Sequence, residues 1–174
     1  EGFRVTYLPV DQYGRVKLSA LREALCKETI LVSIMYVNNE VGSVQPVKEA
    51  AGIVKAYNRE IIFHSDAVQG FGKYRIFPKR EGIDLLTVSS HKIHGPKGMG
   101  ALYISDKVKI RPIVFGGEQQ KNIRSGTENV PGIAGFALAA KMVYSDLEEK
   151  TARMRKLKER FIEGIRQVDH VSVH

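Results

Sequence analysis

Residues 85–99 read Leu-Leu-Thr-Val-Ser-Ser-His-Lys-Ile-His-Gly-Pro-Lys-Gly-Met, and this stretch decides the fold. Its first four residues predict a short strand, and the glycines and proline that follow predict a loop. The pattern places Lys92 just past the end of the strand. A lysine there, shielded from water and close to other cations, can lose its proton and attack an aldehyde. Taken alone, Lys92 fits a solvated loop lysine better, because the chain holds 27 lysines and arginines.

Two further strands precede this stretch. Residues 30–37 are nearly continuously apolar, as expected of a strand that is covered on both faces in a parallel sheet. Residues 60–63 start the next strand, which runs into His-Ser-Asp-Ala-Val-Gln, residues 64–69. Between the two strands, Pro46 and the apolar period of residues 47–57 predict a helix. This order implies right-handed crossovers, so the sequence predicts an α/β fold with a mainly parallel sheet between helices.

The shorter elements follow from the same patterns. Three more short strands are predicted, over residues 5–10, 101–104 and 113–115. The chain before residues 101–104 leaves no room for a crossover helix, so that strand is expected to run antiparallel. A turn is predicted over residues 11–14, and the leucines of residues 18–25 recur at helical spacing, with Ser19 as a candidate helix cap.

The C-terminal part predicts one long helix. After Pro131, apolar residues form a single helical stripe from Ile133 to Ile165, and helices of that length often bridge two domains. Val-Ser-Val at residues 171–173 is typical of the first strand of a second domain. We therefore expect a partial large domain over residues 1–140, followed by a connecting helix and the start of a small domain over residues 141–174. The expected fold is incomplete at both ends.

Composition narrows the classes of function. The 174 residues carry a net charge of +8, but their basic residues are dispersed. The one dense run, residues 153–160, lies in a helical pattern typical of a solvated face, so we expect no nucleic-acid partner. An anionic ligand or an acidic partner fits the charge equally well. No apolar run approaches the ~20 residues of a membrane span. The single cysteine, Cys26, suits a reducing cytoplasm and has no metal-ligand spacing around it.

Polar side chains follow three successive strands at the point where each strand ends. They are Asn39, then Asp66 and Gln69, then Ser89, His91 and Lys92. The carboxyl ends of parallel strands meet at one edge of a sheet, where ligands bind. A lysine that binds an aldehyde and a carboxylate that keeps a ring nitrogen protonated are the pair that pyridoxal phosphate needs. The two amides could bond ring substituents or substrate, and Ser89, His91 and Thr127 could serve a phosphate.

Each of these residues also has a purely structural interpretation. Asp66 could cap a helix, and Asn39 could stabilise its own turn. Gln69 lies one helical turn from Asp66 and could be solvated, while residues 124–127 could be an ordinary surface loop. His64 and His94 are interpreted as structural. The functional interpretation depends on the joint pattern, since several independent accidents would have to coincide at one edge of the sheet.

Four segments make the interpretation more specific. They are Val-Asn-Asn-Glu-Val-Gly (37–42), His-Ser-Asp-Ala-Val-Gln (64–69), Ser-Ser-His-Lys-Ile-His-Gly-Pro-Lys-Gly (89–98) and Arg-Ser-Gly-Thr-Glu-Asn (124–129). In order and approximate spacing they resemble the NifS/IscS-like cysteine desulfurases, which are class V aminotransferase-fold enzymes dependent on pyridoxal phosphate. The resemblance covers essentially the whole chain and implies the large-domain fold of pyridoxal-phosphate-dependent transferases.

The resemblance also implies roles for single residues. Lys92 would bind the cofactor aldehyde and act as general base, and Asp66 would be the partner of the ring nitrogen. The remaining implied contacts are the ring hydroxyl for Gln69, the ring and substrate carboxylate for Asn39, the phosphate for Ser89 and His91, and the phosphate of a neighbouring subunit for Thr127. A homodimer is therefore implied. The implied reaction converts L-cysteine to L-alanine and passes sulfur, through an enzyme persulfide, to an acceptor or scaffold protein of iron–sulfur cluster assembly in the cytoplasm.

The sequence departs from the family pattern in several places. Gly116 and Gly117 are followed by Glu118, where the family usually has a third glycine. The N-terminal phosphate loop, the ring-stacking histidine and the C-terminal nucleophilic cysteine and arginine have no counterpart, and Cys26 matches none of them. We expect that this chain alone does not desulfurate cysteine. The alternatives are a selenocysteine lyase, another class V aminotransferase, or a non-catalytic interaction module that keeps the fold and contacts an acidic partner through residues 153–160.

Overall fold

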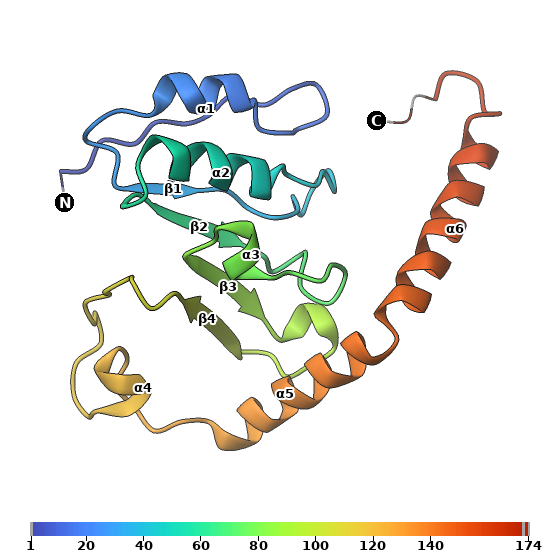
Figure 1. The fold of residues 1–174 in the computed structure, drawn as a ribbon. Coiled ribbons are helices and arrows are strands. Elements are labelled where there is room, and N and C mark those ends of the chain that lie inside the picture. Colours follow the sequence, from blue (N-terminus) through green and yellow to red (C-terminus); the bar gives the residue numbers. More distant parts are fainter. Residues whose placement is uncertain (1, 172, 174) are drawn as a thin grey trace.

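A four-stranded sheet with helices forms the centre of the computed structural model, which describes residues 2–171 and residue 173 (Figure 1). The strands are β1 (Leu31–Ser33), β2 (Ile62–Asp66), β3 (Leu85–Ser89) and β4 (Gly100–Ile104), in that spatial order. The first three are parallel, and β4 runs antiparallel to β3. The predicted α/β class and the antiparallel direction of residues 101–104 are confirmed. In the ladder Asp66 pairs with Thr87, and Ser89 pairs with Gly100.

Helices separate the strands and continue beyond the sheet. They are α1 (Leu18–Ala24), α2 (Val47–Tyr57), α3 (Pro78–Glu81), the 3₁₀ helix η1 (His91–Ile93), α4 (Gln119–Asn122), α5 (Val130–Ser145) and α6 (Leu147–Ile165). Helix α2 begins directly after Pro46, as its sequence predicts, because a proline at a helix start sacrifices no helical hydrogen bond. The turn over residues 11–14 is also confirmed, with the Asp11 carboxylate accepting bonds from the amides of Tyr13 and Arg15.

The hydrophobic core lies between one face of the sheet and helices α1 and α2. Its buried members are Leu21, Leu25, Val32, Ile34, Val47, Ala50, Ala51, Ile53, Val54, Ile61, Phe63, Ala67, Ile83 and Leu86. Strand β1 is buried only at its middle residue, and Leu31 on the opposite face is 50% exposed. The expectation that residues 30–37 are covered on both faces is therefore wrong. Within the described residues, the core helices pack on one face, and Leu102 of β4 is also exposed on the other.

Several predicted local features do not form. Residues 5–10 make no ladder with any described segment beyond one bridge between Val10 and Val16, and residues 113–115 are exposed and form no strand. Ser19 does not cap α1, because the helix begins one residue earlier, after Lys17. A strand forms only where a neighbour continues its backbone hydrogen bonds, and residues 5–10 and 113–115 make only isolated ones to the described residues, from the amide of Lys17 to Pro9 and from that of Ser125 to Val114.

The predicted long helix is interrupted. Asp146, with φ −132° and ψ 34°, separates α5 from α6 and forms a 2.8 Å ion pair with Lys150 in the first turn of α6. An aspartate before a helix is a favoured N-terminal residue, because its charge complements the helix dipole. Figure 1 shows α6 extending away from the sheet. The predicted strand at residues 171–173 includes Ser172, which lies outside the described residues.

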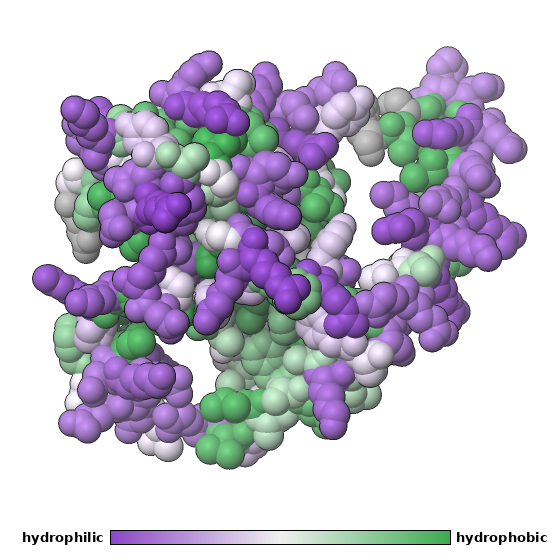
Figure 2. Space-filling view, viewed as in Figure 1, coloured by the Kyte–Doolittle hydropathy of each residue, from purple (hydrophilic) through white to green (hydrophobic). Residues whose placement is uncertain are grey.

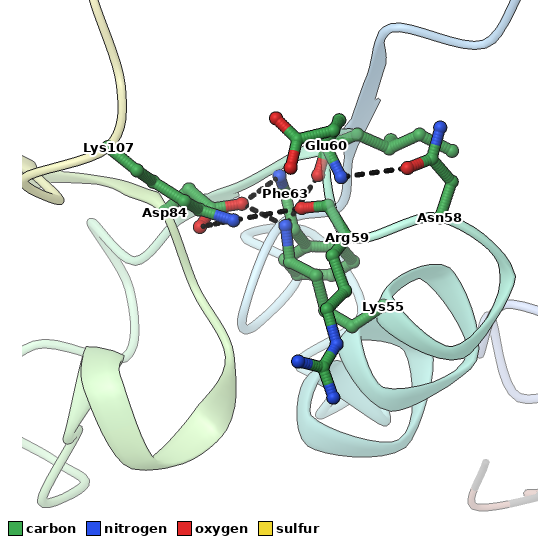
Figure 3. A network of polar contacts seen from close by, with 8 residues as sticks. Lys55, Asn58, Arg59, Glu60, Phe63, Asp84 and Lys107 are labelled. Carbon is green, nitrogen blue, oxygen red and sulfur yellow. Dashed lines mark hydrogen bonds and ion pairs between the residues drawn. The ribbon is translucent and has the colours of Figure 1, made fainter.

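The buried carboxylate of Asp84 links α2, β2 and the segment after β4 (Figure 3). Asp84, which precedes β3 and is 5% exposed, forms ion pairs with Lys55 of α2 and, at 3.0 Å, with Lys107 after β4. Its Oδ2 also accepts a 2.7 Å hydrogen bond from the amide of Phe63 in β2. Burial acts to raise the pKa of the Asp84 carboxyl, but the Lys55 ammonium and the Phe63 amide outweigh it and hold this pKa below its usual range.

The surface is mostly polar, and exposed apolar side chains interrupt it in several places, α5 among them. Figure 2 shows polar side chains over most of the visible face and hydrophobic side chains gathered over α5. The exposed residues there include Val130, Leu138 and Met142, at 67%, 58% and 61%. The basic run at residues 153–160 is exposed along α6, as its sequence predicts. Among the described residues, no helix combines the length and apolar character needed to cross a membrane.

Candidate active site

The carboxyl ends of β2 and β3 form the edge that carries the predicted site. Asp66 is the last residue of β2, and Ser89 is the last residue of β3. The chain after β1 reaches the same edge, because the amide of Tyr36 donates a 2.7 Å hydrogen bond to the carbonyl of Asp66. That segment continues into the turn with Asn39. The parallel ladder thus brings together the strand ends that carry Asn39, Asp66 and Ser89.

The Asp66 carboxylate has one structural bond and one available oxygen. Its Oδ1 accepts a 2.9 Å hydrogen bond from the amide of Val68 and so holds the turn that follows β2; no helix begins there, so the helix-cap interpretation of Asp66 is wrong. Its Oδ2 makes no hydrogen bond to the described residues. The side chain is half-buried, and Gln69 lies beside it in the turn of residues 67–70, also half-buried. Asp66 can therefore hold its own turn through Oδ1 and still accept a hydrogen bond from a ligand at Oδ2.

His64, two residues before Asp66 in β2, contacts both neighbouring parallel strands. His64 Nδ1 lies 2.7 Å from the Ser33 hydroxyl of β1, and its Nε2 lies 2.8 Å from the Thr87 hydroxyl of β3. Burial lowers the pKa of His64, although the nearby charge of Asp66 acts in the opposite direction. The neutral imidazole is thus favoured, and it links β1, β2 and β3 directly beneath Asp66. The sequence-based interpretation of His64 as a structural residue agrees with this geometry.

Two hydroxyls beside Lys92 are buried without a hydrogen-bond partner. These are Ser89 Oγ, at the end of β3, and Ser90 Oγ, in the residue before η1. A buried hydroxyl without a partner is costly, and a ligand oxygen at this position would satisfy it. Because Ser89 lies at the carboxyl end of a strand with a cationic turn after it, the donor chemistry fits a phosphate. The residues present therefore fit the phosphate group of pyridoxal phosphate.

Lys92 lies in η1 and is exposed. It lines a cavity of about 890 Å³ between η1, the loop after β2 and helices α5 and α6. Asp66 and Ser89 do not line this cavity, so the Lys92 side chain and the two strand-end groups open onto different spaces. Rotation about the flexible lysine side chain is needed to bring its amine toward the strand ends.

The other predicted residues are more dispersed. Asn39 is exposed, and its amide donates a 2.7 Å hydrogen bond to Glu40, while His91 is exposed at the start of η1. Thr127 is exposed in the segment between α4 and α5, which Figure 1 shows well apart from η1. The structure therefore does not bring Thr127 to the strand ends of its own chain.

Lys73 is a residue that the sequence analysis missed. It lines the same cavity as Lys92, and burial together with the positive charge of Lys92 lowers the pKa of Lys73. The only local signal is its place in a glycine-rich turn, between Gly70 and Tyr74, soon after the second site strand. Its closeness to Lys92 depends on a tertiary contact that no sequence spacing shows.

The chain is similar in sequence to known proteins over its whole length. The whole chain, residues 1–174, matches the family model described as aminotransferase class V. Cysteine desulfurase IscS of Methanosarcina thermophila is 48% identical over 176 residues, which cover 100% of this chain and 43% of that protein. Putative cysteine desulfurase IscS 1 of Bacillus subtilis is 49% identical over 166 residues, covering 95% and 43%.

Solved structures agree with these sequence matches. A NifS-like protein superposes with a TM-score of 0.91 at 46% identity, covering 94% of this chain and 45% of that one. A NifS-like protein from Rickettsia africae superposes with a TM-score of 0.89 at 40% identity, covering 95% and 46%. The chain thus spans less than half the length of these relatives.

Proposed function

The chain belongs to the class V aminotransferase family, and on that premise we propose that it forms the cofactor-binding part of a pyridoxal-phosphate-dependent cysteine desulfurase. The names of its relatives support this assignment, since proteins 48% and 49% identical to it are described as IscS cysteine desulfurases. The single observation that carries the proposal is the strand edge with an available Asp66 oxygen and an unsatisfied Ser89 hydroxyl.

Four side chains of this edge would hold the cofactor. Ser89, with His91 beside it, would donate hydrogen bonds to the phosphate, and Asp66 would keep a proton on the ring nitrogen. Gln69 would contact the ring hydroxyl from the turn that Asp66 organises. Bound pyridoxal phosphate supplies an aldehyde that condenses with amines and a ring that withdraws electrons.

Lys92 and Asn39 would act on the reacting groups. Lys92 would hold the cofactor aldehyde until the substrate amine displaces it there, and the freed Lys92 amine would then remove the proton from the substrate Cα as a general base. The Asn39 amide would orient the substrate carboxylate by hydrogen bonding. With L-cysteine as substrate, loss of the Cα proton prepares the C–S bond for cleavage, and L-alanine is the carbon product.

Cys26 would not accept the sulfur. It follows α1 near the helical side of the sheet, and its amide and thiol contact the Thr29 hydroxyl at 3.0 and 3.5 Å. The nucleophilic cysteine would come from sequence beyond these 174 residues, and the 174-residue chain alone would not turn over cysteine. Thr127 would reach a neighbouring subunit in a homodimer, and residues 1–140 and 141–174 would be the partial large domain and its connection. The whole protein would pass sulfur to an acceptor or scaffold protein of iron–sulfur assembly in the cytoplasm.

Two ligands that differ by one phosphate test this assignment. We expect Ser89→Ala to weaken the binding of pyridoxal phosphate roughly tenfold, as for loss of one hydrogen bond to a charged group, and to leave pyridoxal binding unchanged. The measurement is a spectroscopic titration with each ligand. Ser105→Ala removes another buried, unpartnered hydroxyl and is the matched control. Equal losses for both ligands would contradict a phosphate contact at Ser89.

A further inference from the structure

A second cavity lies at the end of β3 that is opposite to the cofactor edge. Its volume is about 630 Å³, a size typical of small-molecule sites. Asp84, which precedes β3, lines this cavity, whereas Ser89 at the other end of the strand does not. The extended strand separates these two positions by roughly 16 Å. A ligand in this cavity would therefore be separate from one at the strand ends that carry Asp66 and Ser89.

Cations outnumber carboxylates in the lining of this cavity. The charged side chains that line it are Lys55, Arg59, Lys79, Lys107, Asp84 and Asp106. Two positive charges therefore remain when each carboxylate is paired with one cation. Glu60, which is outside the lining, also acts on Lys107 and reduces this excess without cancelling it. An excess of positive charge in a concave site favours an anionic ligand.

The two lysines around Asp84 each keep one hydrogen for a further bond (Figure 3). Lys107 Nζ lies 3.0 Å from Asp84 Oδ1 and donates a 3.0 Å hydrogen bond to the carbonyl of Arg59. Lys55 Nζ donates to Asp84 Oδ2 and to the carbonyl of Ile61. An ammonium group has three hydrogens, so each lysine can still donate once more. One carboxylate thus faces two ammonium groups and neutralises only half of their charge.

The guanidinium of Arg59 is also available to a ligand. It makes no hydrogen bond or ion pair with the residues drawn around it, and Figure 3 shows it turned away from Asp84. Arginine presents several donors in a fixed plane that suits the oxygens of a phosphate. Lys79 forms only a 3.8 Å pair with Asp106, and both of these side chains are exposed. Such a pair is weak, so Lys79 can also turn toward an anion.

Two hydroxyls at this cavity point to a ligand independently of the charges. Tyr103 of β4 and Ser105, just after the strand, line the cavity. Their hydroxyls are buried without a hydrogen-bond partner among the described residues. A buried hydroxyl without a partner is costly, and a ligand oxygen that reaches it removes that cost. An oxyanion is the acceptor that suits hydroxyl, ammonium and guanidinium donors together.

We propose that this cavity binds a phosphate-bearing small molecule, held by Arg59, Lys107 and the Tyr103 hydroxyl. A phosphate supplies the negative charge that the lining lacks, and its oxygens can accept a bond from each of these donors. Asp84 keeps Lys107 in place from below, and Asp106 opposes the anion by repulsion. This site is independent of the function proposed above, since no residue of the cofactor edge takes part in it.

A nuclear magnetic resonance titration of the isotope-labelled chain with inorganic phosphate tests this site, with ionic strength held constant by chloride. We expect saturable shifts of the backbone amides of Gly82, Ser105 and Lys107, which line the cavity. Chloride alone should not produce them. Glycerol phosphate in a parallel titration identifies the source of the phosphate group. Tighter binding than inorganic phosphate indicates an organic phosphate ester, and equal or weaker binding indicates free phosphate.

Three substitutions check which groups hold the anion. Arg59→Gln should weaken phosphate binding about two- to fivefold, as for one solvent-exposed ion pair. Asp106→Asn should strengthen it by a similar factor, because it removes a repelling charge. Tyr103→Phe removes one unpartnered hydroxyl and should weaken binding about tenfold. Lys109→Gln removes an exposed charge outside the lining, so it is the matched control for Arg59→Gln and should leave binding unchanged.

The amide spectrum also shows whether each variant stays folded. Shifts that chloride reproduces at equal ionic strength would overturn the inference, as would an affinity that Lys109→Gln lowers as much as Arg59→Gln does. A phosphate affinity that Tyr103→Phe or Asp106→Asn leaves unchanged would also overturn it. Ser89→Ala alters the cofactor edge alone and should not change this affinity, so the two sites can be refuted separately.

Discussion

The Asp84 carboxylate accepts a 2.7 Å hydrogen bond from the backbone amide of Phe63, and so joins the residue before β3 to the second residue of β2. Because Asp84 is 5% exposed and also pairs with Lys55, replacing it leaves a mostly buried ammonium without its partner. We expect Asp84→Asn to lower the free energy of unfolding by about 3 kcal/mol, measured by urea denaturation. Asp106→Asn, at an exposed position with a 3.8 Å pair to Lys79, should cost about 0.5 kcal/mol or less.

The same carboxylate predicts a pH dependence. The folded pKa of Asp84 lies below its unfolded value, so its contribution is fully present above the unfolded pKa and is lost as the pH falls through the folded pKa. We therefore expect the stability difference between the original chain and Asp84→Asn to shrink as the pH is lowered below about 4. A difference that stays constant from pH 7 down to pH 3 would show that the charge of Asp84 does not stabilise the fold.

The contact between Gly72 and Ile93 predicts a second stability effect. Gly72→Ala would place a methyl group 2.6 Å from Ile93 at a left-handed φ, and we expect it to cost about 2 kcal/mol by urea denaturation. Gly52→Ala is the matched control, because Gly52 is exposed inside α2 with no neighbouring atom within 4 Å. It should instead stabilise the chain by about 0.5–1 kcal/mol. Equal effects of the two substitutions would contradict the tight packing of the turn on η1.

His64 predicts a loss of stability at mildly acidic pH. Burial holds its folded pKa below the unfolded value of about 6.5, so the unfolded chain binds a proton more readily. Stability should therefore fall as the pH decreases from 7.5 to 5, and His64→Asn should reduce this slope. His94→Asn, which removes an imidazole from an exposed position, serves as the comparison. If stability falls equally steeply with pH in His64→Asn and in the original chain, protonation of His64 between Ser33 and Thr87 is not the cause.

Tyr36 predicts a change at the opposite end of the pH scale. Burial, reinforced by the Glu81 carboxylate that its hydroxyl bonds at 3.2 Å, raises the pKa of Tyr36 to about 12. In an ultraviolet titration of the folded chain, one tyrosine should ionise near that pH, and Tyr36→Phe should remove this step. If Tyr36→Phe instead removes a step near pH 10, the phenol is not shielded as the structure indicates.

The sequence predicts the central strands well because burial and backbone pairing agree there. Residues 62–66 and 85–89 place Phe63 and Leu86 in the core against α1 and α2 and are polar at their carboxyl ends, so periodicity and turn signals point to the same answer. Residues 5–10 are also rich in strand-forming residues, but among the described residues they form only the single bridge from Val10 to Val16. Strand-forming composition shows that a segment can join a sheet, whereas the neighbour that completes the pairing is a tertiary property.

In the candidate site, too, local sequence predicts some features, whereas others depend on tertiary contacts. Asp66 and Ser89 could be placed at one edge because parallel strands share a direction, a rule that needs only local sequence. The contact of Tyr144 with Gly72 joins positions 72 residues apart, and no motif indicates it. The break at Asp146 did have a signal, since Ser145-Asp146 is a typical helix start within the helical stripe.

The most direct test of the account is to locate the lysine that binds pyridoxal phosphate. The chain is mixed with the cofactor, reduced with borohydride and mapped by peptide mass spectrometry, alongside Asp66→Ala and the exposed-site control Asp106→Ala. We expect an adduct mainly at Lys92 that is lost in Asp66→Ala and kept in Asp106→Ala. Labelling scattered over surface lysines, or an adduct at Lys92 that is indifferent to Asp66, would contradict it.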